Sequence, residues 1–68
     1  MSEYQEWVND KVQEVLYNAG VVDTITEVWF TPIHGMRHVV GIKNHNKVAF
    51  AVWFDKDYEE WKFERREL

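Results

Sequence analysis

Residues 47–54, with the sequence Lys-Val-Ala-Phe-Ala-Val-Trp-Phe, constrain the fold of this chain more than any other stretch. From Val48 to Phe54 no side chain is polar. Side chains alternate between the two faces of an extended strand, so this segment is apolar on both faces. A strand of that kind needs cover on both faces. We therefore expect the segment to lie inside a sheet that has a further layer on each side.

The length of the chain makes such a requirement demanding. Sixty-eight residues predict one domain, spanning 1–68, near the lower limit for a core that sustains itself. Domains this small often depend on a disulfide, a metal or a partner subunit. The chain has no cysteine, which excludes disulfides and thiolate chemistry and fits a reducing compartment. Its four Trp, three Tyr and four Phe residues supply core material instead, because each ring can bury about 150–250 Å².

The first residues contain no basic segment followed by an apolar run, which predicts that there is no signal peptide. No apolar stretch approaches the roughly 20 residues that span a bilayer. We expect a soluble, cytoplasmic protein that does not enter a membrane.

The first part of the chain has the pattern of an amphipathic helix from Ser2 to Ala19. Ser2 is the expected N-cap, and Gly20 is the expected left-handed residue after the last turn. The apolar residues of this helix recur at helical spacing: Tyr4, Val8, Val12, Val15, Leu16 and Ala19.

Three strands are predicted next, over residues 24–31, 37–43 and 47–54, because each is rich in β-branched and aromatic residues. Pro32 ends the first of them. Asn44-His45-Asn46 has the length and composition of a hairpin connection. Such short connections predict an antiparallel meander.

The last segment is compatible with two structures. Asp57-Tyr-Glu-Glu60 has the form of a capping box and favours a short helix. The alternation of residues 60–64 instead favours a fourth strand. The predicted fold is α+β, with an N-terminal helix packed on a three-stranded antiparallel meander and a C-terminal short helix or fourth strand.

One helix can cover only one face of this sheet, and we expect the bulkier rows beneath it. Those rows are Val28, Phe30, Val40, Ile42, Phe50, Val52 and Phe54. The opposite face, which would also carry Ile25, is then apolar and open. Its predicted partner-binding residues are Trp29, Val39, Gly41, Ala49, Ala51 and Trp53. Three kinds of cover are compatible with such a face: Tyr58 and Trp61 of the same chain, a second copy, or a different protein.

No motif for catalysis, cofactor binding or metal binding emerges from the sequence. His34 and His45 belong to predicted loops and His38 is expected to point inward with Val40, so the three do not converge as zinc ligands. The carboxylates fall on helix surfaces and turns rather than in a paired arrangement. We therefore expect neither an enzyme nor a metalloprotein.

Nucleic-acid binding is the main alternative to protein binding. The order α-β-β-β-α resembles that of double-stranded-RNA-binding domains, which implies a lysine-rich start to the last helix that grips phosphates. The matching segment here, residues 55–60, is mainly acidic. His34 is the one residue that matches the family's loop histidine. A second route is the stacking of single-stranded bases on the sheet. The cations available for binding nucleic acid are Arg37, Lys43 and Lys47.

The sequence thus favours a small, non-enzymatic, intracellular protein-binding module that forms a homodimer through its outer sheet face. It has a net charge of −4, and its middle, residues 28–54, is only mildly basic. This charge disfavours nucleic acid as a partner, since phosphate contacts need clustered cations.

Overall fold

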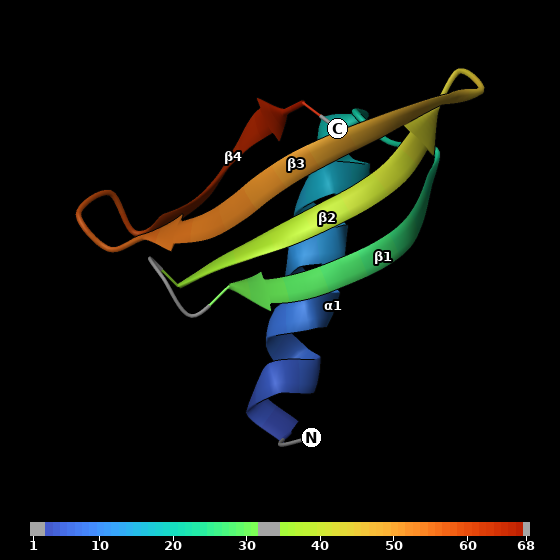
Figure 1. Ribbon diagram of the computed structural model, residues 1–68. Helices are drawn as coiled ribbons and strands as arrows, with labels where there is room; N and C mark the ends of the chain where they lie inside the picture. Colours follow the sequence, from blue (N-terminus) through green and yellow to red (C-terminus); the bar gives the residue numbers. More distant parts are fainter. Residues whose placement is uncertain (1–2, 32–34, 68) are drawn as a thin grey trace.

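The computed structural model describes residues 3–31 and 35–67, with side chains described for 6–30 and 35–67. Within these residues a helix is followed by a four-stranded antiparallel sheet, an α+β fold, with the strands in the order β1-β2-β3-β4. The elements are α1 (Glu3–Ala19), β1 (Thr24–Thr31), β2 (Met36–Lys43), β3 (Asn46–Asp55) and β4 (Glu60–Arg66). Figure 1 looks onto the open face of the sheet, with α1 behind it. The C-terminal segment forms the fourth strand rather than the short helix.

Helix α1 ends where the sequence predicts. Gly20 has a φ of 72°, and its N–H donates to the Tyr17 carbonyl at 3.1 Å. The N–H of Val21 reaches back to the Leu16 carbonyl at 3.4 Å, which closes the last turn. The predicted N-cap, Ser2, lies outside the described residues.

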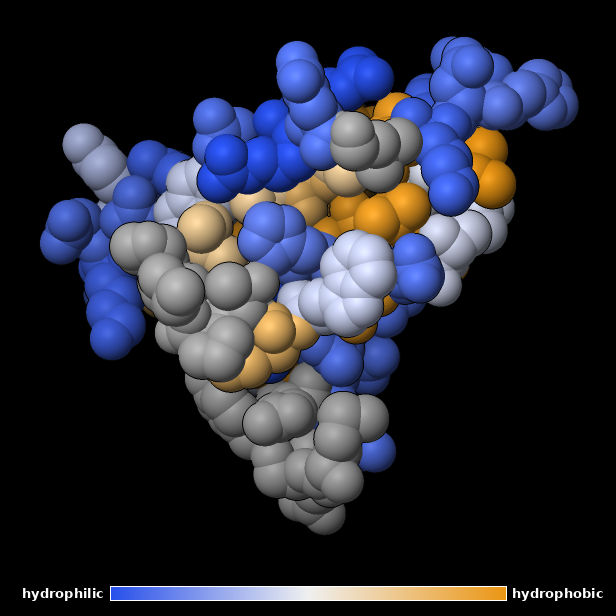
Figure 2. Space-filling view, viewed as in Figure 1, coloured by the Kyte–Doolittle hydropathy of each residue, from blue (hydrophilic) through white to orange (hydrophobic). Residues whose placement is uncertain are grey.

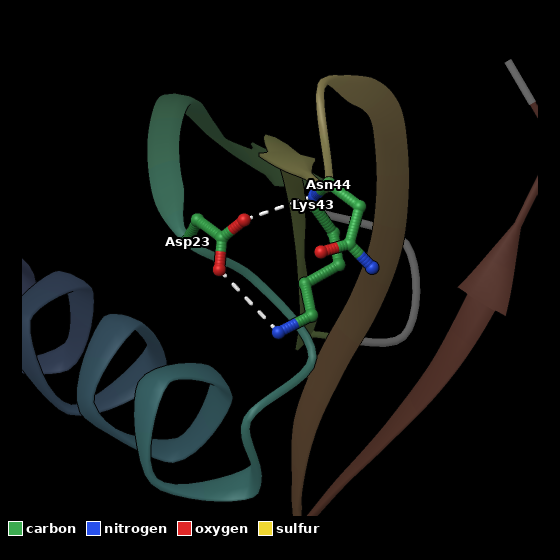
Figure 3. Close-up of polar contacts among 3 residues, drawn as sticks. All are labelled: Asp23, Lys43 and Asn44. Atoms are coloured by element: carbon green, nitrogen blue, oxygen red, sulfur yellow. Dashed lines mark hydrogen bonds and ion pairs between the residues drawn. The ribbon is translucent and has the colours of Figure 1, made fainter.

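The connection between β2 and β3 is a two-residue turn. Asn44 and His45 both have positive φ, at 52° and 69°, as a type I′ hairpin turn requires. The Asp23 carboxylate accepts hydrogen bonds from the Asn44 N–H at 2.9 Å and from Lys43 Nζ at 3.3 Å (Figure 3). The Asp23 N–H donates to the Ile42 carbonyl at 2.7 Å. One carboxylate thereby attaches the start of β1 to the β2–β3 turn.

The core lies between α1 and one face of the sheet. Its buried residues come from the helix, the strands and the α1–β1 connection: Val8, Val12, Leu16, Val22, Val39, Val48, Phe50 and Val52. All five residues of β3 from Val48 to Val52 are buried, as its apolar sequence predicts. Only one of the two expected layers is found within the described residues, because α1 covers a single face.

The expected facing of β2 is wrong. Val39 pairs with Phe50 and Gly41 with Val48, so Val39 and Gly41 face the helix, while Val40 and Ile42 face outward. We expected the bulkier residues of β2 to lie beneath the helix, and the reason that they do not is steric. A Cβ on Gly41 would lie 2.5 Å from the Thr24 carbonyl oxygen. The residue of β2 that faces this carbonyl therefore has to be glycine.

Ile25 is also on the helix side, where it packs against the core instead of lying beside Trp29. The register of β1 against β2 shifts between Ile25 and Glu27. This bulge inserts one residue, so side chains before and after it change faces. Thr26, the inserted residue, donates its hydroxyl to the Val40 carbonyl at 3.1 Å.

Candidate functional site

The outer face of the sheet is the first candidate surface. Figure 2 shows it as an apolar band over the middle strands, bordered by hydrophilic residues along the β4 side. Strand pairing places the charged residues Glu27 and Lys47 on this face, beside Val40 and Ile42. Between them and β4 lies what we call the outer apolar surface: Trp29, His38, Val40, Ile42, Ala49, Ala51 and Trp53.

The predicted partner-binding residues divide between the two faces. Trp29, Ala49, Ala51 and Trp53 lie together on the outer face, whereas Val39 and Gly41 lie beneath the helix. On β2 the residues that face outward are instead His38, Val40 and Ile42. His38 therefore points outward, opposite Trp29 on one side and Ala51 on the other, and not inward.

The outer apolar surface has a low centre and a raised rim. Ala51 is 0% exposed and Ala49 is 9% exposed, although α1 lies on the other face. Ala51 is flanked by His38 on β2 and Glu64 on β4, whose longer side chains rise beside it. Trp29, by contrast, is 51% exposed at the margin. The apolar centre of the surface is thus buried within the single chain, and its exposed apolar residues are at the margin.

A row of charges borders the outer apolar surface along β4. The outward residues Glu60, Lys62, Glu64 and Arg66 alternate in sign. Lys62 Nζ lies 3.0 Å from the Asp55 carboxylate and Arg66 lies 3.8 Å from Glu64. Sequence reasoning missed this row because it left the segment open between a short helix and a fourth strand, and these four residues share a face only in a strand.

The aromatic residues of β4, Trp61 and Phe63, do not cover the outer apolar surface, whereas Tyr58 in the preceding turn lies 4.3 Å from Lys62 Nζ on the outer side. Trp61 pairs with Phe54, and their rings meet edge to face at 5.4 Å. Phe63 meets Phe50 at 5.9 Å. Because Phe50 belongs to the core under α1, both contacts lie on the helix side of the sheet. The expectation that Trp61 helps to close the outer face is therefore wrong.

The cations expected to bind nucleic acid do not gather on one surface. Arg37 is 5% exposed; it donates to Asn9 Oδ1 at 2.9 Å and lies 4.3 Å from the Phe30 ring centroid on the helix side. Lys43 is paired with Asp23. The resemblance in element order to double-stranded-RNA-binding domains also fails, because β4 stands where those domains have a helix.

No group of three or more potential metal ligands occurs among the described residues. His34 lies outside them, while His38 faces outward in β2 and His45 is exposed in the β2–β3 turn.

Acid is expected to destabilise the turn that leads into β4. The Lys62 ammonium group, and then the N–H groups of Tyr58 and Asp57, hold the pKa of Asp55 below its ordinary value of 3.8. A carboxyl with a lowered folded pKa stabilises the fold above its unfolded pKa, and this contribution is lost as the pH falls through the folded pKa. Thermal unfolding between pH 7 and pH 2 should therefore show a smaller loss of Tm for Asp55→Asn than for the unmodified chain. Equal losses would contradict this assignment.

Among the described residues no helix has the length and apolar character needed to cross a membrane. Comparison of the chain with models of protein families, with curated proteins and with solved structures found no match.

Proposed function

We propose that this protein is a non-catalytic binding module and that a second copy of the chain is the partner of its outer apolar surface. The observation that carries the proposal is the one-sided cover of the sheet: α1 packs on one face, and β4 brings its aromatic residues to that same face. The centre of this face is buried within the single chain, while Trp29 and Ile42 at its margin are exposed, and exposed apolar residues that border one another in this way are typical of interfaces. We propose a cytoplasmic location because a chain without cysteine fits a reducing compartment.

The dimensions of the outer face suit a symmetric contact. Four strands spaced about 4.8 Å apart and about eight residues long present a flat area of about 500 Å². A standard interface buries about 800 Å² on each partner, so the flat area supplies somewhat more than half of this and side-chain relief has to supply the rest. Two sheets pack about 10 Å apart when their facing side chains interdigitate. The small residues Ala49 and Ala51 at the centre leave room for the rim tryptophans of the other copy.

Replacement of Trp53 by glutamate tests this contact. Trp53 lies on the outer face opposite Lys62, so a glutamate there gains a nearby cation in the single chain but becomes a desolvated charge between two copies. We expect light scattering after size exclusion to give half the molar mass of the unmodified chain. The folded chain should persist, as judged by its circular dichroism.

Phe30→Glu is the matched control. Phe30 is half-exposed in β1 and also lies beside a cation, Arg37, but it is on the helix side. This variant should keep the molar mass of the unmodified chain. If Trp53→Glu leaves the mass unchanged, the outer face is not the contact. If Phe30→Glu halves it as well, the effect is not specific to that face.

A further inference from the structure

The edge of the sheet at β4 is a second surface of interest. β4 is an outer strand of the sheet, and it pairs with β3 in an unbroken register from Ala49/Arg66 to Asp55/Glu60. The edge strand on the other side, β1, is interrupted by its bulge. An edge strand presents backbone N–H and C=O groups that can pair with another strand, and bulges are one device that prevents such pairing. β4 has no such bulge, so its backbone groups are arranged to pair with another strand.

The side chains of β4 are complementary to themselves. In a symmetric antiparallel pair one residue faces its own counterpart, and the others face each other at equal distances from it. With Phe63 at the axis, Glu60 faces the partner's Arg66 and Lys62 faces the partner's Glu64. Each pair also occurs in reverse, so the row of outward charges makes four contacts of opposite sign.

Registers with the axis at Lys62 or at Glu64 lack this property. An axis at Lys62 sets that lysine against itself and Glu60 against the partner's Glu64. An axis at Glu64 sets two glutamates together and brings Lys62 against the partner's Arg66. Like charges directly opposite each other destabilise a strand pair. Axes at Trp61 or Arg65 also set opposite charges together, Glu60 against Lys62 or Glu64 against Arg66, but each makes two such contacts where the axis at Phe63 makes four. The sequence of β4 therefore favours the register centred on Phe63.

The helix side of the strand fits the same register. An axis at Phe63 brings the two Phe63 rings together, and Phe63 is 37% exposed in the single chain. The same register sets Trp61 against the partner's Arg65, an aromatic ring against a guanidinium group. The intrachain pairs of Lys62 with Asp55 and Arg66 with Glu64 are partly exposed, so their rearrangement costs little.

From this complementarity we propose that two copies pair edge to edge through β4, in antiparallel register centred on Phe63, to form one continuous sheet of eight strands. This contact rests on a different observation from that of the outer apolar surface and is separate from it. Its twofold axis runs perpendicular to the sheet, whereas the axis of a face-to-face contact lies parallel to it. Perpendicular twofold axes are those of a tetramer with two kinds of interface.

The test uses the Trp53→Glu chain, in which the outer-face contact is removed. That chain should be a dimer that dissociates on dilution. Adding Lys62→Glu sets two pairs of glutamates against each other, and adding Glu64→Lys sets two pairs of lysines against each other, so each should weaken the dimer at least about tenfold. When these two variants are mixed, every facing pair is again opposite in sign. The mixture should form heterodimers as tight as the dimer of Trp53→Glu alone.

The mixture is decisive because Lys62→Glu and Glu64→Lys also disturb ion pairs within their own chains. Mixing cannot repair those, so recovery of the dimer identifies contacts between chains. Failure of the mixture to pair would overturn the edge contact. A Trp53→Glu chain that is monomeric at all concentrations would overturn it as well, while leaving the outer-face proposal intact if the unmodified chain is a dimer.

A cysteine at the axis tests the register. The chain has no cysteine of its own. In the Trp53→Glu background, Phe63→Cys places two thiols on directly opposed residues, whose Cα atoms lie about 4.5–5.5 Å apart, within the range that a disulfide bridges. Glu60→Cys places them about 20 Å apart. Mild oxidation should crosslink the first variant and not the second; the reverse result would contradict the register.

Discussion

Replacement of Leu16 by alanine is expected to leave most of the isolated chain unfolded. Leu16 is 0% exposed and, with Val8 and Val12, is one of three residues buried against the sheet among the helix side chains that the structure describes. Truncating a buried leucine costs about 3–5 kcal/mol when the surroundings cannot collapse into the space. A chain of this length has a free energy of unfolding of only about 3–10 kcal/mol. Because one helix supplies the whole second layer among the described residues, a cavity there removes a large part of the stability.

Urea unfolding followed by circular dichroism measures this loss. Glu14→Ala, an exposed change two residues away on the same helix, is the control and should shift the midpoint little. If self-association is real, the Leu16→Ala chain should also regain structure as its concentration rises, since assembly stabilises the folded state by mass action. A loss below about 1 kcal/mol would contradict the account of the core.

Replacement of Gly41 by alanine is expected to destabilise the fold by about 2 kcal/mol or more, the cost of forcing a methyl group into an occupied space. The added Cβ would lie 2.5 Å from the Thr24 carbonyl oxygen and 3.2 Å from a Val22 methyl group. The backbone must move to make room. On an open outer face the same change would be neutral or would stabilise the strand, because glycine is the poorer strand residue. The sign of the effect thus reports which face Gly41 occupies.

A second substitution separates the two contacts. Val22→Ala removes the side-chain contact and leaves the contact with the Thr24 carbonyl. If the backbone is the obstacle, Gly41→Ala should remain destabilising when measured in the Val22→Ala chain. Full recovery of the loss in that chain would show that only the Val22 side chain was in the way.

The elements that the sequence predicts well are those specified by local chemistry. The end of α1 at Gly20 follows from the need for a positive φ, and the β2–β3 turn follows from residues that tolerate it, Asn44 and His45. The apolar run of β3 specifies a buried strand whichever partners it finds. Each of these depends on neighbouring residues alone.

The facing of β1 and β2 depends instead on contacts distant in sequence. β2 is apolar on both faces, so its alternation does not decide which row meets the helix. The facing is set by the close approach of the Thr24 carbonyl to Gly41 and by the bulge after Ile25. Neither is visible as a local pattern.

The last segment was ambiguous because Asp57 and Glu60 match a capping box while residues 60–64 alternate. In the structure Asp55 accepts the N–H groups of Asp57 and Tyr58, and Glu59 takes a φ of 52°, so these residues form a tight turn. The prediction of the candidate site was affected both by the facing of β2 and by the ambiguity of the last segment. Four of its six predicted residues lie on the outer face, and the alternating charges of β4 became visible only with the strand in place.

Sedimentation equilibrium of the unmodified chain tests most directly whether a second copy covers the sheet. Over concentrations from about 1 μM to about 1 mM, a range that spans weak and moderate affinities, the account predicts a molar mass that rises to an even multiple of 8.3 kDa. A mass of 8.3 kDa throughout this range, for a chain that is folded, would contradict it.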